Sequence, residues 1–333
     1  MRVPEFELVS PSTVAEACGF LGGDRDGTRV IAGGTDLLVA LKEGLKTPKV
    51  VVDLGGVEDL AKIVYTPAGG LEIGSMVTLR RLAGDAMVRK HYPVLTYAAL
   101  QVATPQIQSM ATVGGNLCQD SCCMYFNRPA EVRLPLPPCH KLGGSVCHVV
   151  LDSPTCWAPY AGDMAPALMA IGATVTVADR NGEKTIPVGD IFCDDGARPV
   201  VLDPGQLITK IRCPAPRPRS GAVYIKMRAR NTLDYAVAGV AASVRLEAAG
   251  ETCAEATVVL TGVGSCPMAV SEAAGIVGKP LSDEILEKVA EAATRLSYPV
   301  KNVVGSDPAY RRDMVKLNVK RSVREAVRIA AAA

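Results

Sequence analysis

Apolar runs and amphipathic stretches alternate at the start of the chain. Residues 29–32 and 50–54 are short, mostly apolar and bounded by turn-forming residues, which is typical of buried strands. Between them, residues 35–41 place Leu37, Leu38 and Leu41 on one face of a helix. The Gly33-Gly34 pair joins the first strand to this helix. The pattern predicts a compact unit of strand, glycine turn, helix and strand.

A second unit begins near residue 69, and an irregular segment interrupts it. Residues 117–162 are dense in proline, which excludes long regular elements there. Around this segment the apolar periodicity predicts helices at 79–86, 92–102 and 165–172, strands at 71–74, 173–178 and 207–211, and a hairpin turn at 179–182. A second glycine turn, Gly114-Gly115-Asn116, precedes the irregular segment.

The last third of the chain follows a proline-rich linker at 214–220. Alternating apolar positions predict strands first, and helical spacing follows them. We expect strands at 222–227, 237–246 and 256–262 and helices at 282–296 and 310–332.

Composition narrows the classes of function. The chain has 333 residues, enough for about two domains. A net charge of +2 and an aromatic content of 4% offer no basic or stacking surface for nucleic acid. No apolar run approaches the roughly 18 residues of a membrane span. The opening segment MRVPEFELVS has no apolar signal region, so we expect a protein of the reducing cytoplasm.

The two glycine turns are candidate anion sites. A Gly-Gly pair before a helix lets backbone N–H groups approach a phosphate closely, and the helix end adds partial positive charge. Gly33-Gly34-Thr35-Asp36 and Gly114-Gly115-Asn116 could together grip the two halves of a pyrophosphate. Neither matches the dinucleotide or P-loop fingerprints. Tight turns without a ligand remain the alternative for either pair.

Cysteines gather in the irregular segment. The chain has 11, and six lie between positions 118 and 156: Cys118, Cys122, Cys123, Cys139, Cys147 and Cys156. Four thiolates are what a [4Fe–4S] cluster requires. Structural zinc is an alternative because His140 and His148 each follow a cysteine, and ordinary buried thiols are another. The reducing compartment disfavours disulfides.

Several motifs resemble the FAD-binding subunits of the molybdenum hydroxylases. The segments are 31–38 (IAGGTDLL), 111–117 (ATVGGNL), 162–168 (GDMAPAL) and, near the end, Tyr310-Arg311-Arg312. That family includes the medium subunit of carbon monoxide dehydrogenase and the flavin domain of xanthine dehydrogenase. The resemblance covers almost the whole chain and implies an α+β fold. Residues 1–220 would form a PCMH-type FAD-binding domain, with subdomains at about 1–56 and 57–220. Residues 221–333 would form a C-terminal domain of the CO dehydrogenase flavoprotein type.

The resemblance also implies the residues that hold FAD. They are Ala32, Gly33, Gly34, Thr35 and Asp36 in the first motif, Thr112, Gly114, Gly115 and Asn116 in the second, and then Asp163, Leu207 and Lys226. A helix cap is the alternative role of Asp163, and an exposed strand position is that of Lys226. Neither glycine turn contains His or Cys, so we expect FAD to bind noncovalently.

The insert at 117–162 is similar to one in the flavoprotein subunits of 4-hydroxybenzoyl-CoA reductases. That insert distinguishes those subunits from their relatives and binds an additional [4Fe–4S] cluster. The matching ligands are Cys123, Cys139, Cys147 and Cys156. Cys122 is the rival of its neighbour Cys123, and the sequence leaves this choice open.

The resemblance implies an electron-transfer subunit without acid–base catalytic residues. Electrons from a ferredoxin-type donor would pass through the [4Fe–4S] cluster and FAD to a small [2Fe–2S] subunit. They would end on a large molybdopterin subunit that reductively removes a phenolic hydroxyl from an aryl-CoA. The complex would be a heterohexamer of two three-subunit units. Two alternatives remain. One is an FAD subunit of another molybdenum hydroxylase, passing electrons from substrate to an acceptor, and the other is a zinc-stabilised nucleotide-binding scaffold subunit.

Overall fold

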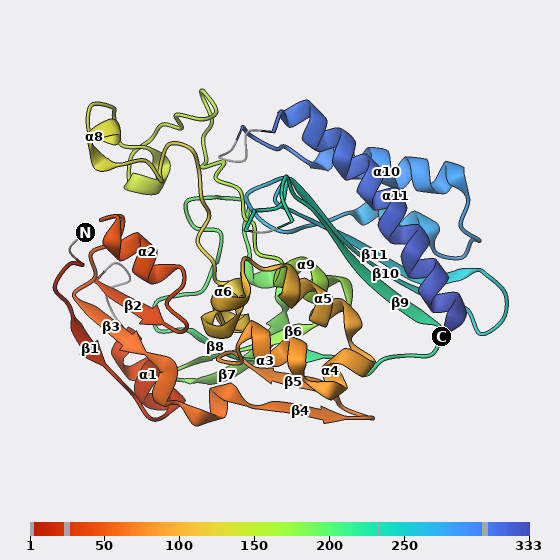
Figure 1. Cartoon of the computed structure of the whole chain (residues 1–333), viewed down its shortest axis with the longest axis horizontal. Helices are drawn as coiled ribbons and strands as arrows, with labels where there is room; N and C mark the ends of the chain where they lie inside the picture. The colour runs from red at the N-terminus through yellow and green to blue at the C-terminus, as the bar shows by residue number, and fades with distance from the viewer. Residues whose placement is uncertain (1–2, 23–26, 232, 302–305) are drawn as a thin grey trace.

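The computed structural model describes residues 3–22, 27–231, 233–301 and 306–333. The first two residues of the predicted first domain therefore lie outside the described residues. Three sheets follow one another along the chain (Figure 1). Their strands occupy residues 7–53, 63–213 and 220–269 in turn. Among the described residues, no helix is both long and apolar enough to cross a membrane.

The first sheet has three parallel strands in the order β1 (Glu7–Val9), β3 (Val50–Asp53), β2 (Thr28–Ile31). Helix α1 (Val14–Leu21) begins at Thr13, whose side chain accepts from the amide of Glu16, and α2 (Leu37–Lys42) follows the first glycine pair. The predicted strand–turn–helix–strand unit is confirmed. Strand β1 escaped prediction because three residues, two of them exposed, carry no period-two signal.

The second sheet has five antiparallel strands in the order β4 (Ile63–Thr66), β5 (Gly70–Gly74), β8 (Leu207–Cys213), β6 (Thr174–Asp179), β7 (Gly182–Pro187). Its central strand β8 comes last in sequence. The helices of this unit are α3 (Leu79–Gly84), α4 (Ala86–His91), α5 (Pro93–Gln101), α6 (Pro105–Met110), α7 (Val113–Leu117) and α9 (Met164–Ala170). They bury one face of the sheet in the largest apolar core of the described residues, which includes Ile73, Val175 and Ile211.

Two details differ from the sequence prediction. The single helix expected at 79–86 is two helices, because Asp85 ends α3 and its carboxylate caps α4. The second glycine pair is not a turn before a helix. Gly114 and Gly115 lie inside α7, which Thr112 caps through the amide of Gly115.

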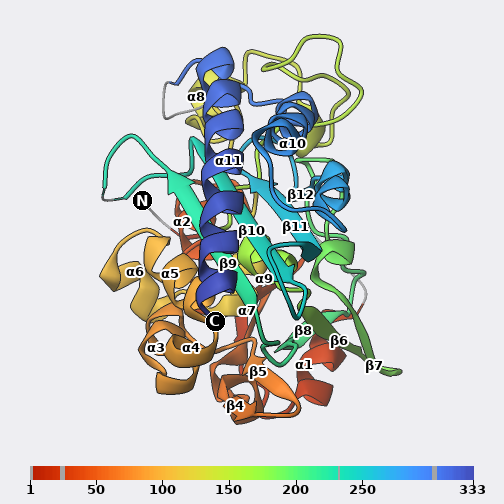
Figure 2. The same cartoon turned by 90° about the vertical axis from the view of Figure 1, so that its right-hand side faces the viewer.

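The third sheet has four antiparallel strands in the order β12 (Met268–Ala269), β11 (Cys253–Thr261), β10 (Ala238–Leu246), β9 (Ser220–Met227). Helices α10 (Asp283–Leu296) and α11 (Pro308–Ala332) cover one of its faces (Figure 2). At Gly221 a Cβ would lie 2.1 Å from the carbonyl oxygen of Ala326, so this glycine lets β9 approach α11 closely. The α+β architecture expected from the resemblance is confirmed.

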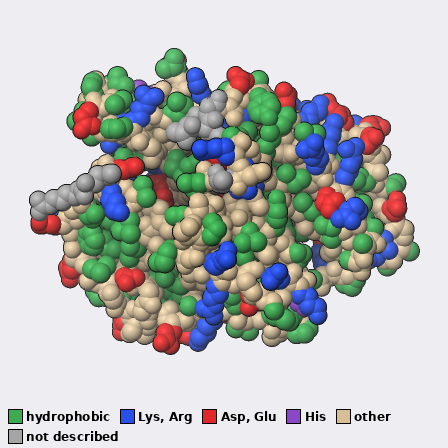
Figure 3. Space-filling view, in the orientation of Figure 1, with side chains coloured by type: hydrophobic (Ala, Val, Ile, Leu, Met, Phe, Trp, Pro, Cys, Tyr) green, Lys and Arg blue, Asp and Glu red, His purple; other side chains and the backbone are tan. Residues whose placement is uncertain are grey.

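The cysteine-rich insert between α7 and α9 forms a separate lobe above α2 (Figure 1). It holds only α8 (Ala130–Arg133) and a 3-10 helix at His140–Leu142, as its proline content predicts. Further 3-10 helices elsewhere lie at Leu54–Gly56, Glu58–Ala61, Val188–Ile191 and Ser271–Ile276. Apolar side chains show on the surface of the lobe (Figure 3), and Leu134 and Leu151 are 80% and 83% exposed.

Arg311 joins three segments of the C-terminal domain. Its guanidinium is fully buried and donates to the carbonyl oxygens of Val237, at 2.9 Å, of Val300, at 2.6 Å, and of Gly262. Burial lowers its pKa to about 10, so the group stays protonated at neutral pH. One side chain from the first turn of α11 thus fixes the end of β11, the residue before β10 and the segment that follows α10.

We predict that Arg311→Met destabilises the fold. Methionine fills much of the volume but leaves three buried carbonyl oxygens without their donor. Each unsatisfied buried polar group costs about 1–3 kcal/mol, and removal of a buried charge offsets part of this. The free energy of unfolding should fall by about 2–4 kcal/mol, measured by denaturant titration. Arg312→Met, at the exposed neighbouring position, is the control. Equal stability of the two variants would contradict this role.

Candidate functional site

The two glycine segments lie against each other. A Cβ on Gly33 would sit 1.8 Å from the carbonyl oxygen of Met110, a distance no side chain permits. A Cβ on Gly115 would come within 4.0 Å of the Cβ of Ala32. Residues 32–36 and 110–116 therefore meet backbone to backbone, although more than seventy residues separate them in sequence. The meeting of the two motifs, expected from the sequence, is present in the structure.

The first segment turns because Gly34 has a φ of +71°, a left-handed conformation that favours glycine. The amide of Leu38 donates to the Gly34 carbonyl at 3.0 Å and starts α2. Asp36 occupies the N-cap position, but its carboxylate makes no capping hydrogen bond. It accepts instead from the backbone amide of Asp120 at 3.0 Å, which ties this segment to the start of the insert.

The amides of the second segment are already used within the protein. Gly114 donates to the Ser75 carbonyl at 2.9 Å, Gly115 to the Thr112 hydroxyl at 3.0 Å, and Asn116 to the Thr112 carbonyl at 2.9 Å. The prediction that these residues offer a free set of anion donors therefore needs correction. Close packing explains why position 114 is a glycine, because a Cβ there would lie 2.7 Å from the Cβ of Ser75.

Asn116 connects this segment to a buried ion pair. Its side-chain oxygen accepts from the amide of Met164 at 3.0 Å, next to Asp163. The Asp163 carboxylate pairs with Lys226 at 2.9 Å and accepts from the Tyr224 hydroxyl at 2.6 Å. Lys226 also donates to the Gln101 carbonyl at 3.0 Å.

Burial of this pair decides between the alternative roles of its members. The side chains of Lys226 and Asp163 are only 2% and 4% exposed, so Lys226 is not a surface strand residue. Asp163 makes no side-chain cap bond to α9, so its carboxylate does not serve as a helix cap. Burial raises the pKa of Asp163, and the charge of Lys226 and the hydroxyl of Tyr224 oppose that rise. The pair joins α9 to β9 and so links the second unit to the C-terminal sheet.

Leu207 lies in a different environment from the other predicted flavin residues. Its side chain is 6% exposed and packs in the core of the first unit with Ala17, Leu21 and Ala178. The structure thus brings together the two glycine segments and places Asp163 and Lys226 next to Asn116. Leu207 starts β8 and packs against α1.

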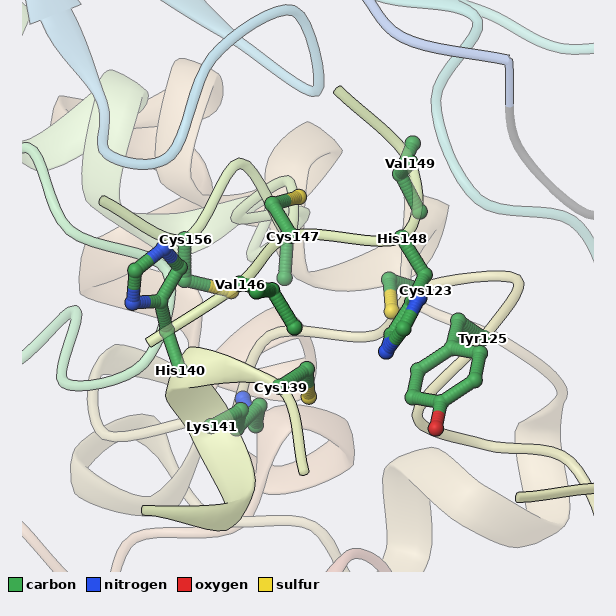
Figure 4. A pocket seen from close by; sticks show the side chains of 11 residues that line it. Cys123, Tyr125, Cys139, His140, Lys141, Val146, Cys147, His148, Val149 and Cys156 are labelled. Atoms are coloured by element: carbon green, nitrogen blue, oxygen red, sulfur yellow. The ribbon is translucent and has the colours of Figure 1, made fainter. Parts of the chain in front are cut away.

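Four cysteines of the insert line one pocket. Cys123, Cys139, Cys147 and Cys156 surround it together with Lys141 and other insert residues (Figure 4). Cys139 and Cys156 are each 6% exposed. Figure 4 shows the sulfur of Cys147 turned away from the middle of the group. Among the described residues, no three His, Cys, Asp or Glu side chains are arranged closely enough to hold a metal ion.

Backbone amides already donate to two of these sulfur atoms. The amide of Phe126 donates to Cys123 Sγ at 3.0 Å, and that of Val150 to Cys147 Sγ at 3.3 Å. Burial raises the pKa of the Cys123 thiol and raises that of Cys156 to about 11, while the charge of Lys141 opposes both rises. Without a bound cation, these two thiols are therefore protonated at neutral pH.

The histidines of the insert bond to backbone. His140 Nε2 lies 2.9 Å from the Ser153 carbonyl oxygen, and His148 Nε2 lies 2.8 Å from that of Pro137. The His148 ring also packs on Tyr125 with centroids 4.2 Å apart. These rings hold the loops of the insert together, which weighs against their use as zinc ligands. All 11 cysteines are free thiols.

Cys122 faces away from the four-cysteine pocket. Its Sγ lies 3.6 Å from the hydroxyl of Tyr235, and both residues line a second pocket with Ala236 and Gly262. Cys123 lines both pockets. The adjacent residues Cys122 and Cys123 thus lie in different environments.

Sequence reasoning missed three polar residues of these sites. Tyr224 stands two residues before Lys226 on the same strand, so the two side chains share a face of the sheet. That spacing could have placed Tyr224 at the ion pair. Lys141 and Asp120 had no comparable signal, because they lie in an insert without periodicity.

The comparisons with known proteins agree along almost the whole chain. Residues 4–216 match the family described as the FAD binding domain in molybdopterin dehydrogenase, and residues 222–326 match the CO dehydrogenase flavoprotein C-terminal domain. The aldehyde oxidoreductase FAD-binding subunit PaoB of Escherichia coli is 36% identical over 82% of this chain and 85% of its own. The carbon monoxide dehydrogenase medium chain of Afipia carboxidovorans is 29% identical over 96% of each chain.

A solved structure shows the same fold. The carbon monoxide dehydrogenase from Hydrogenophaga pseudoflava, in a form lacking the Mo-pyranopterin moiety of its cofactor, superposes with a TM-score of 0.79. It is 25% identical, and the match covers 98% of both chains. Together with the two family matches, this shows that the chain belongs to the FAD-binding medium subunits of the molybdenum hydroxylase family of oxidoreductases.

Proposed function

We propose that this chain is the FAD- and [4Fe–4S]-containing electron-transfer subunit of a complex like 4-hydroxybenzoyl-CoA reductase. One observation carries the finer part of this proposal. Cys123, Cys139, Cys147 and Cys156, scattered over an insert of irregular structure, line a single pocket. Packing alone gives no reason for four thiols to gather in a loop that has little apolar core of its own.

The glycine segments fit noncovalent FAD. Gly33 and Gly115 let the two segments pack closely against each other, and Gly34 supplies the turn that leads into α2. The proposed FAD contacts are those of the two motifs, residues 32–36 and 112–116, with Asp163 and Lys226. Because the amides of Gly114, Gly115 and Asn116 are engaged, this second segment would shape the site by close approach of its backbone.

The pocket in the insert fits an iron–sulfur group by its donor set. Thiolates are the ligands of such clusters, and amide donors to sulfur accompany them. Cys123 is the proposed first ligand, because Cys122 faces Tyr235 instead. Ligation would require the Cys147 side chain to turn inward and the buried thiols to lose their protons, as metal binding generally demands.

When bound, FAD exchanges electron pairs and a cluster exchanges single electrons. Together they can pass electrons between a one-electron carrier and a two-electron reaction. The chain's own residues hold and shield these groups. Lys226 and Asp163, whose side chains are almost fully buried, neutralise each other in an ion pair. The proposed partners are a large molybdopterin-binding subunit and a small [2Fe–2S] subunit in a heterohexamer. The cytoplasm is the proposed location, and aryl-CoA dehydroxylation is the proposed reaction of the large subunit.

The insert lobe offers a surface for the proposed ferredoxin-type donor. Val132, Leu134, Leu136 and Leu151 are exposed there. Arg128, Glu131 and Asp152 are exposed on the same lobe, so the contact would rest on the apolar side chains and not on net charge.

A second candidate function is an FAD subunit of another molybdenum hydroxylase that passes electrons from substrate to an acceptor. The names of the relatives, an aldehyde oxidoreductase and carbon monoxide dehydrogenases, favour this candidate. The zinc-stabilised scaffold is less well supported, because His140 and His148 bond to backbone carbonyls.

Metal analysis separates these candidates. We expect four irons and four acid-labile sulfides per FAD in the full-length chain purified without oxygen. Cys139→Ser should abolish the cluster's electron paramagnetic resonance signal and leave FAD bound, because Cys139 lines the pocket in the insert. Cys122→Ser is the matched control and should retain all four irons. Zinc without sulfide in the parent chain would refute the cluster and favour the scaffold.

We predict that Gly33→Ala reduces FAD affinity at least tenfold. The new methyl group would meet the Met110 carbonyl and force the two glycine segments apart. The dissociation constant is measured by flavin fluorescence on the full-length chain stripped of FAD. Gly19→Ala is the control, because a Cβ at Gly19 meets no atom within 4 Å. Wild-type affinity in Gly33→Ala would show that FAD does not depend on this contact.

A further inference from the structure

Lys141 is a buried cation at the centre of the insert. Its side chain is 1% exposed, and its ammonium contacts oxygen atoms of three residues. It pairs with Asp120 Oδ1 at 2.6 Å and donates to the carbonyl of Ser121 at 2.8 Å and to that of Gly196 at 3.1 Å. The Ser121 hydroxyl lies 2.6 Å away as well. A lysine is buried this fully only when such partners replace its water.

The same lysine borders the four-cysteine pocket. It follows Cys139 by two residues, in the 3-10 helix His140–Leu142, and Figure 4 shows it beside Cys139. Its ammonium also lies 5.1 Å from the centre of the Phe126 ring, and the backbone amide of Phe126 donates to Cys123 Sγ. The positive charge is therefore held on the inner side of the pocket, away from solvent.

The counter-charge of Lys141 is more exposed than Lys141 itself. The Asp120 side chain is 35% exposed, and it is shared with Lys46 at 3.6 Å. Water screens the carboxylate more strongly than the buried ammonium. Among the residues that line the cysteine pocket, Lys141 is the only lysine or arginine, and no carboxylate is among them. Through the Asp120 amide, this arrangement also reaches Asp36 in the first glycine segment.

We propose that Lys141 is a positioning residue that raises the reduction potential of the metal group held by the four cysteines. This inference rests on the proposed function. One-electron reduction adds one negative charge at the pocket and breaks no bond, with the electron coming from the reduced carrier protein. A fixed, desolvated cation stabilises the reduced state more than the oxidised state, and net charge near an iron–sulfur group sets its potential. Lys141 makes the pocket a better electron acceptor.

Two substitutions test this proposal in opposite directions. Lys141→Met removes the cation and should lower the ratio of reduced to oxidised centre about tenfold at a fixed potential. That corresponds to ~59 mV for a one-electron couple. Asp120→Asn removes the counter-charge, keeps the amide bond to Asp36 and an acceptor for Lys141, and should raise the ratio. Potentials are read from redox titrations of the full-length chain followed by electron paramagnetic resonance.

The controls separate charge from folding. Lys288→Met removes an exposed lysine of α10 and should leave the potential unchanged. If Lys141→Met fails to fold, the potential of Asp120→Asn alone tests the proposal, because this substitution keeps the backbone contacts of residue 120. A cluster present with wild-type potentials in both variants overturns the role of Lys141 alone. A parent chain without iron or sulfide overturns the cluster proposal, and the role of Lys141 falls with it.

Discussion

The buried ion pair of Asp163 and Lys226 fixes how the C-terminal sheet sits on the rest of the chain. Removal of one partner from such a pair leaves an uncompensated buried charge, at a cost of about 3–5 kcal/mol. The pair anchors the start of α9, whose first amide binds Asn116, and Asn116 ends the segment that meets Gly33. The register of the two glycine segments is thus tied to the C-terminal domain through one chain of polar contacts.

The two candidate cofactor sites follow different physical principles. The glycine segments are held by backbone hydrogen bonds and close packing, so their shape exists before any ligand arrives. The four cysteines line one pocket, but their sulfur atoms are not arranged to bind a common ligand. Cys147 faces away, and buried thiols such as Cys156 are protonated. Metal binding and local ordering are coupled at a site of this kind. The shape of the first site is set by the fold alone, whereas the proposed cluster would complete the second.

Strongly periodic elements were predictable from the sequence, and short ones were not. The apolar stripe of α10 and the alternation of β6 and β10 appear where periodicity places them. Strand β1 and helix α6 are too short to show a period, and β8 pairs with β5 and β6, which lie far earlier in the chain. At the sites, residue types predicted the cysteines and glycines. The engaged amides of Gly114 and Gly115, and the buried Lys141, depend on long-range contacts that no local pattern carries.

The insert leaves and re-enters the fold at nearly the same point. Asn116 Oδ1 binds the amide of Met164, and the Tyr160 hydroxyl donates to the carbonyls of Asn116 and Leu117. Because these contacts hold the two ends of the insert together, the position of the ends depends little on the length of the loop between them. Closure entropy changes by only about 0.6 kcal/mol for each doubling of loop length. A loop of different length or sequence could therefore span these two anchors, provided that it kept Tyr160, which belongs to the main core, and the Asp120 amide that binds Asp36.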